Sequence, residues 1–144
     1  MLFINILLSF LMLITGGSMP NTQINNYFNQ AVEINIYKDN QMYSFKTGED
    51  IFDKILSKIN DICEGSIEMP AYGVSLDSDT RNAMKKGLWI ELDFKKTLTH
   101  NDMPFERLLV EINDEFTGIN FIRRHDGLYE GRCFYLNLSK PIKI

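Results

Sequence analysis

Residues Leu88–Lys95 read LWIELDFK, and this stretch decides the fold because apolar and polar side chains alternate in it without a break. Such a two-residue period is typical of a β-strand whose two faces meet different surroundings. One face carries Leu88, Ile90, Leu92 and Phe94, and the other carries Trp89, Glu91, Asp93 and Lys95. The stretch therefore predicts one strand of a sheet that buries the first of these faces.

Similar patterns lie on both sides of this strand. They predict strands over residues 32–37, 42–46, 105–112, 119–124 and 129–138. The pair Asp39-Asn40 separates the first two, and Asp126-Gly127 separates the last two. Both pairs are typical of tight hairpin turns, so these neighbours should run antiparallel. A polar loop over residues 97–104 is expected between the two central strands.

One long amphipathic helix is predicted over Gly48–Glu64, with Thr47 as its N-cap and Gly65 just after its end. Its apolar side chains recur every three or four residues and form one stripe. They are Ile51, Phe52, Ile55, Leu56, Ile59 and Ile62. An irregular connection over Ser66–Leu76 and a short surface helix ending near Lys86 should follow.

These elements define an α+β fold with a mainly antiparallel sheet of about six strands, in the order ββα, loop, ββββ. The long helix should pack on one face of the sheet. There it would cover a core of alternating side chains from the last strands, which are Leu88, Ile90, Leu92, Phe94, Leu108, Val110, Ile112, Phe134, Leu136 and Leu138.

The chain divides into an apolar leader over residues 1–18, a polar linker over 19–30 and one α+β domain over 31–144. A short helical turn is expected in the linker, because Ile24, Tyr27 and Phe28 lie at helical spacing. The leader is too short to cross a bilayer and has the length of a signal-peptide core, with small residues near Ser18. No Lys or Arg precedes it, however, and residues 15–18 can equally be encoded by a bacterial ribosome-binding site ahead of a true start at Met19. A signal peptide predicts secretion or display at the cell surface, whereas a start at Met19 predicts a cytoplasmic protein.

The net charge of −4 gives no electrostatic basis for binding nucleic acid or anionic membranes. The second face of the sheet mixes aromatic and charged side chains of kinds that are enriched at protein interfaces. The predicted partner-binding residues are Trp89, Glu91, Asp93, Arg107, Tyr129 and Tyr135. They favour a small non-enzymatic protein-binding domain, such as an acidic inhibitor or a toxin-neutralising immunity protein. The plainer interpretation is a solvated face with cross-strand pairs.

Two alternatives stay open. A small hydrolase would use His100 with Asp102, or His125 with Asp126, although turn chemistry also explains both pairs. A small-ligand module would use the space between the sheet and the Ser66–Leu76 connection. The acid-x-lysine pattern Asp93-Phe94-Lys95 resembles an element of metal-dependent nucleases, but alternating charges on a strand account for it. No cofactor and no metal are predicted.

The two cysteines, Cys63 and Cys133, are predicted to remain free thiols. Cys63 lies near the apolar stripe of the helix, whereas Cys133 points to the face of the sheet away from the core.

Overall fold

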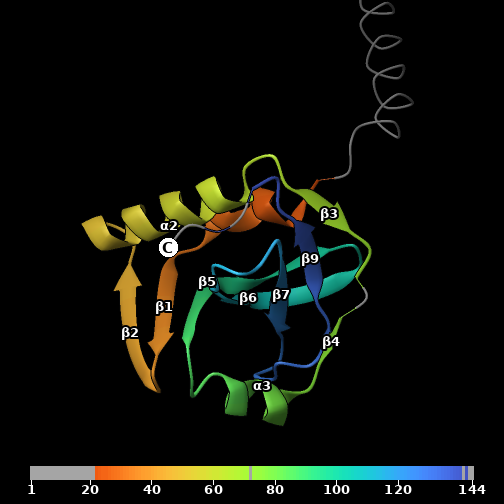
Figure 1. Cartoon of the computed structure of the whole chain (residues 1–144). Helices are drawn as coiled ribbons and strands as arrows, with labels where there is room; N and C mark the ends of the chain where they lie inside the picture. Colours follow the sequence, from red (N-terminus) through yellow and green to blue (C-terminus); the bar gives the residue numbers. More distant parts are fainter. Residues whose placement is uncertain (1–21, 72, 141, 143–144) are drawn as a thin grey trace, which may run out of the picture.

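The central stretch Leu88–His100 forms strand β5, which lies inside a seven-stranded sheet (Figure 1). The computed structural model describes residues 22–71, 73–140 and 142. Its elements in chain order are η1 (Ile24–Gln30), β1 (Glu33–Lys38), β2 (Gln41–Lys46), α2 (Asp50–Cys63), β3 (Ile67–Met69), β4 (Val74–Ser75), α3 (Asp77–Ala83), β5 (Leu88–His100), β6 (Met103–Glu111), β7 (Gly118–Arg124), β8 (Gly131–Arg132) and β9 (Phe134–Asn137).

The strand order in the main sheet is β2-β1-β5-β6-β7-β9-β3, and its paired strands are antiparallel. A separate two-stranded ribbon joins β4 to β8. The predicted α+β class with a mainly antiparallel sheet is confirmed. The number of elements differs from the prediction of about six strands and one long helix, because the described residues contain seven strands in the main sheet and three helices. Strands of two or three residues, such as β3, β4 and β8, are too short to show a period in the sequence.

The hairpin turns lie where the sequence predicts them. Asp39 and Asn40 both have positive φ angles, of 51° and 68°, as a type I′ turn requires. Asp126 and Gly127 also have positive φ, and the flanking residues His125 and Leu128 exchange two backbone hydrogen bonds of 3.0 Å. These local sequences therefore set the register of the strands around them.

The expected loop over residues 97–104 is much shorter in the structure. Strand β5 continues to His100, and β6 begins at Met103 after a turn at Asn101 and Asp102. A bulge between Asp93 and Leu98 interrupts the register of the two strands. Beyond this bulge Phe105 is buried in the main core, although simple alternation places it on the opposite face.

Helix α2 begins at Asp50, with Glu49 in place of Thr47 as its N-cap, and Gly65 follows its end with a φ of +73°. It buries Phe52 and Ile59 against the sheet, whereas Ile55 and Leu56 are only half-buried. The main core also contains the predicted sheet residues Leu92, Phe94, Leu108, Val110, Phe134 and Leu136.

The predicted linker is part of the domain in the residues that the structure describes. Ile24 and Phe28 of η1 are fully buried in the main core, and the Phe28 ring lies 5.1 Å from that of Phe121. The packed domain therefore begins ahead of Ala31. The leader over residues 1–18 lies outside the described residues.

The second face of the sheet has a core of its own. Met84, which follows α3, packs with Trp89, Leu109 and Tyr129, and all four are buried. The segment around α3 therefore covers this face, and Figure 1 shows α2 and α3 on opposite sides of the molecule. The sheet lies between two apolar layers, where the sequence predicts one.

Candidate functional site

A buried carboxylate lies at the centre of this second face. Glu91, in the middle of β5, has no exposed surface. Its Oε1 atom accepts hydrogen bonds from Asn35 Nδ2 at 3.1 Å, the Tyr37 hydroxyl at 2.9 Å and Arg107 Nη1 at 3.0 Å. Its Oε2 atom accepts one from the Tyr129 hydroxyl. The charge of Glu91 is therefore balanced by a guanidinium and fully hydrogen-bonded, as a buried ion requires.

The same guanidinium also contacts a second acid of β5. Arg107 Nε lies 3.1 Å from Asp93 Oδ2, and Lys95 Nζ lies 3.2 Å from the same oxygen. Lys95 in turn reaches Glu33 Oε2 at 2.9 Å. The acid-x-lysine pattern is thus an ion-pair network. It gives Asp93 the cations that its buried carboxylate needs.

The two tyrosines around Glu91 are held in their neutral form. Burial, followed by the charge of Glu91, raises the pKa of Tyr37 from 10.0 to about 12. Burial and the same carboxylate raise the pKa of Tyr129 as well. Both hydroxyls are therefore protonated at neutral pH, and each donates a hydrogen bond to Glu91.

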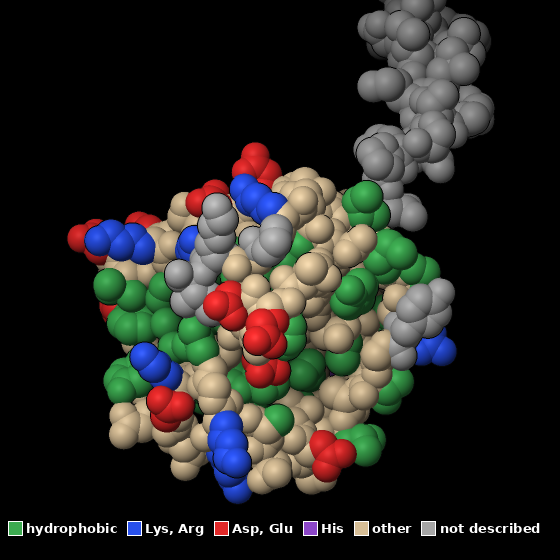
Figure 2. Space-filling view, viewed as in Figure 1, with side chains coloured by type: hydrophobic (Ala, Val, Ile, Leu, Met, Phe, Trp, Pro, Cys, Tyr) green, Lys and Arg blue, Asp and Glu red, His purple; other side chains and the backbone are tan. Residues whose placement is uncertain are grey.

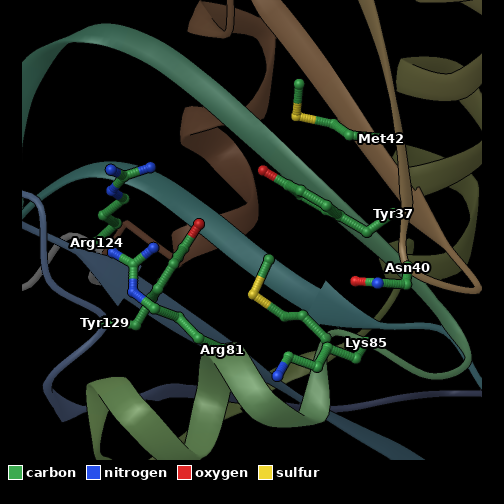
Figure 3. Close-up of a pocket in the computed structure, with 8 residues that line it drawn as sticks. Tyr37, Asn40, Met42, Arg81, Lys85, Arg124 and Tyr129 are labelled. Atoms are coloured by element: carbon green, nitrogen blue, oxygen red, sulfur yellow. The ribbon is translucent and has the colours of Figure 1, made fainter.

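A pocket of about 320 Å³ opens in front of these tyrosines (Figure 3). It lies between the β1–β2 hairpin, the α3 segment and the end of β7. Its walls are Tyr37, Asn40, Met42, Arg81, Met84, Lys85, Arg124 and Tyr129, and we call it the cationic pocket. Three of these eight side chains carry a positive charge, and none carries a negative one.

Arg81 and Arg124 are positioned by the Tyr129 ring. Their guanidinium carbons lie 5.1 Å and 5.3 Å from its centroid, within the range of cation–π contacts. Figure 3 shows both guanidinium groups beside this ring. Arg81 is also neutralised, since its Nε donates to both carboxylate oxygens of Asp77 at 3.0 Å and 2.9 Å. A backbone hydrogen bond from Tyr129, and then the bond from Arg81, lower the pKa of Asp77, which is therefore ionised.

Arg124 and Lys85 differ from Arg81 in this respect. Among the described residues, neither side chain has an ion-pair or hydrogen-bond partner. Two positive charges therefore face the cationic pocket without an ion-pair partner in the part of the chain that the structure describes. Such an arrangement can bind an anion.

Four of the six predicted partner-binding residues are buried. Trp89, Glu91, Asp93 and Tyr129 are all at most 6 % exposed. For Trp89 and Tyr129 the physical reason is Met84, which packs on them just after α3, a helix that the sequence places on the surface. Glu91 is buried by the side chains that donate to it, and Asp93 by Arg107 and Lys95. Arg107 is half-buried, with 26 % of its side chain accessible. The four buried residues therefore offer little surface to a protein partner in this fold.

Tyr135 lies apart from the others. It belongs to β9, which is separated from β6 by β7, so it does not adjoin Trp89 and Arg107 as predicted. Tyr135 lines a hollow of about 240 Å³ with Pro70, Gly73 and Asn120. This hollow lies between the sheet and the Ser66–Leu76 connection, where the sequence predicts a ligand space.

His100 does not pair with Asp102. It is buried at the end of β5, and its Nε2 atom lies 2.9 Å and 2.8 Å from the two carboxylate oxygens of Glu68. Glu68 also accepts a hydrogen bond of 2.6 Å from the backbone N–H of Ile24. The interaction therefore connects β5, β3 and η1, and its role in this fold is to hold these three elements together.

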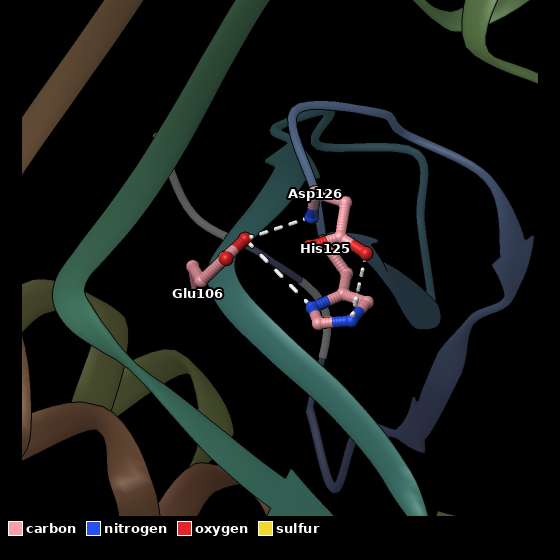
Figure 4. Close-up of side chains that lie close together, drawn as sticks. All are labelled: Glu106, His125 and Asp126. Carbon is pink, nitrogen blue, oxygen red and sulfur yellow. Dashed lines mark hydrogen bonds and ion pairs between the residues drawn. The ribbon is translucent and has the colours of Figure 1, made fainter.

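His125 does lie near Asp126, and Glu106 joins them (Figure 4). Its Nε2 atom is 3.4 Å from Asp126 Oδ2, and its Nδ1 atom is 3.9 Å from Glu106 Oε2. One atom from each residue lies within 4.8 Å of the others, so the three can offer one nitrogen and two oxygens to a metal ion. Asp126 is 82 % exposed, and the contacts of the His125 ring in the described residues are carboxylates, with no nucleophile among them.

Both cysteines are free, as predicted, and both are buried. Burial raises the pKa of the Cys63 thiol to about 12, and it also raises that of Cys133. Both thiols are therefore protonated at neutral pH in this fold.

The lining of the cationic pocket was missed from the sequence. Arg81 lies on α3 and Lys85 in the turn just after it, and Arg124 precedes a hairpin turn. Basic residues at these positions indicate a locally positive surface, but the net charge of −4 for the whole chain hides this local excess. Only the fold brings Tyr37 and Met42 from the first hairpin to the same place.

Comparison with protein-family models, with curated proteins and with solved structures finds no match to this chain. In the described residues, no helix has both the length and the apolar character needed to span a bilayer. The function is therefore inferred from the geometry of this chain.

Proposed function

We propose that this domain is a binding protein for a small anionic ligand, which it holds in the cationic pocket. The observation that carries the proposal is the pair of unbalanced cations, Arg124 and Lys85, facing a concave space. A guanidinium offers a planar set of donors that fits a carboxylate or a phosphate group. Arg124 is therefore the expected anchor, and Lys85 adds a second positive charge.

The dimensions support a small ligand rather than a flat macromolecular surface. A volume of about 320 Å³ lies at the lower end of the range for small-molecule sites. Met42 and Met84 provide apolar wall for an organic part of the ligand, and Asn40 provides an amide. The site thus combines a few polar groups with apolar surface, as ligand pockets do.

The acidic net charge of the chain does not oppose this proposal. At physiological ionic strength charges are screened beyond about 8 Å, so the groups that line the pocket decide its potential. Among the described residues two acids contact its lining, and both are already paired: Asp77 with Arg81, and Glu91 with Arg107.

The protein-binding function predicted from the sequence stays a prediction, as do the hydrolase and the other ligand module. A protein interface would have to use Arg107, Tyr135 and surface outside the six predicted residues, because the other four are buried. The cationic pocket, by contrast, is already open in the folded domain.

Isothermal titration calorimetry with inorganic pyrophosphate and with citrate tests the proposal. We expect saturable binding of at least one of these anions, and we expect Arg124→Gln to weaken it at least tenfold. Raising the salt concentration should weaken it further. Arg132→Gln is the matched control, because Arg132 is exposed on β8 and outside the pocket.

Two results would overturn the proposal. One is the absence of saturable binding of both anions. The other is an equal loss of affinity in Arg124→Gln and Arg132→Gln, which would indicate diffuse charge attraction. Arg124 has no ion pair or hydrogen bond among the described side chains, and its cation–π contact with Tyr129 is worth about 0.5–1 kcal/mol. Arg124→Gln should therefore lower the melting temperature only slightly, and the variant should stay folded during the titration.

A further inference from the structure

A second hollow lies on the opposite face of the sheet, between α2 and the strands. It has a volume of about 290 Å³, and we call it the α2 groove. Its helical wall includes Ile51, Ile55 and Ile62, and its sheet wall includes Leu88, Ile90 and Ile112. Figure 2 shows hydrophobic side chains gathered just below α2, with Lys or Arg side chains along the helix above them.

The groove exists because the sheet does not cover the whole apolar stripe of α2. Phe52 and Ile59 are nearly fully buried, whereas Ile55 and Ile62 are half-buried and Ile51 is 44 % exposed. An amphipathic helix usually buries such a stripe against its own domain. Here one flank of the stripe packs against the core only in part and stays open to solvent on its other side.

The rim of the groove is positively charged. Lys54 and Lys58 are the two polar residues that line it, and they lie four residues apart on the same side of α2. Both side chains are exposed, and among the described residues neither has an ion-pair partner. An occupant that matches this lining needs one apolar chain and one negative end.

We infer that the α2 groove binds a medium-chain fatty acid, with its acyl chain along the isoleucines and its carboxylate between Lys54 and Lys58. From Ile51 to Ile62 the helical wall extends for about 16 Å at the rise of an α-helix. This length suits an extended acyl chain and is greater than the length of a ligand with a single ring. The two ammonium groups select a carboxylate over an alcohol of the same chain length, because only the carboxylate is charged.

Binding of octanoate, decanoate and dodecanoate to the full chain, below their micelle concentrations, tests the inference. Each buried methylene contributes ~0.8 kcal/mol, so affinity should rise about fourfold for every carbon added until the groove is full. Decanol is the uncharged probe. The double variant Lys54→Gln/Lys58→Gln should weaken decanoate binding at least fivefold and leave decanol binding unchanged.

The matched control is Lys38→Gln/Lys46→Gln, which removes two exposed lysines from the β1–β2 hairpin. It should bind decanoate like the natural chain. Ile51→Ser tests the apolar wall at an exposed position where folding is not at risk, and it should weaken both probes.

Three outcomes would overturn the inference. They are no saturable binding of any of the three acids, equal losses in the two lysine variants, and an affinity that does not depend on chain length. Self-association of the chain through this face, seen by light scattering together with an absence of decanoate binding, would assign the groove to a second copy instead.

Discussion

Glu91 orients the polar side chains of the second face, although solvent cannot reach its own carboxylate. Its carboxylate orients Tyr37 and Tyr129 through their hydroxyl groups, and Arg107 supplies the balancing charge. The tyrosines then form the back wall of the cationic pocket. A residue that is buried itself thus determines how two walls of the cationic pocket are oriented.

The neutral state of Tyr37 leads to a prediction about alkaline pH. Its pKa is about 12 in the folded chain and 10.0 without these surroundings. A folded pKa that is raised stabilises the native state fully below pH 10, and this stabilisation is lost as the pH rises towards 12. The free energy of unfolding should therefore fall between pH 10 and 12, and Tyr37→Phe should reduce the steepness of this fall.

Tyrosinate absorbance at 295 nm measures the same groups directly. The chain has six tyrosines, and Tyr37 and Tyr129 should ionise after the exposed ones, close to the pH of unfolding. A single ionisation step near pH 10 for all six would show that the hydroxyls are not held by Glu91.

Side-chain alternation predicted the direction of nearly every β5 residue but could not predict what covers it. Glu91 and Trp89 do point away from the main core, as expected. They are buried because Met84 and α3 pack over them, and this short helix contains little apolar surface to indicate that it does so. The cationic pocket could not be predicted for the same reason, since it exists only where α3 meets the first hairpin.

At the level of elements, the strong local signals were reliable. The turn residues Asp39-Asn40 and Asp126-Gly127 fixed two hairpins, and the stripe of α2 fixed the long helix. The helical spacing of Ile24, Tyr27 and Phe28 indicated the turn of η1, although its Asn and Gln residues resemble a linker. Nothing in so short a segment indicated that Ile24 and Phe28 are buried in the core.

The burial of η1 can be tested by a single truncation. Phe28 is fully buried against Phe121, so Phe28→Ala should lower the free energy of unfolding by about 3–5 kcal/mol. Asn26→Ala, on the exposed side of η1, should change it by less than about 0.5 kcal/mol. Urea denaturation of both variants makes the comparison. Equal and small effects would mean that residues 22–30 are a linker after all.

At the scale of the whole molecule, one sheet carries two cores. The main core lies under α2 and η1, and the smaller one, around Trp89, lies under the α3 segment. Since both layers pack on the same strands, loss of the sheet removes the support of each. The domain should therefore unfold as one unit.

Trp89 allows this cooperativity to be measured, because it is the only tryptophan of the chain. It is 6 % exposed, and its indole N–H donates to Lys86 O at 2.8 Å. Its fluorescence reports the second core, whereas far-ultraviolet circular dichroism reports the whole sheet and α2. The two urea transitions should coincide. A fluorescence transition at lower urea would show that the α3 layer unfolds separately from the sheet.

The position of β3 at the edge of the sheet has a consequence for the order of folding. Its pairing is with β9, where Ile67 lies opposite Asn137, so two segments that are far apart in the sequence must meet. The first hairpin and α2 consist of neighbouring residues and can form early, whereas β3 cannot join the sheet before β9 has done so. A chain cut before Phe134 therefore lacks the strand that holds β3, together with the core side chains Phe134 and Leu136.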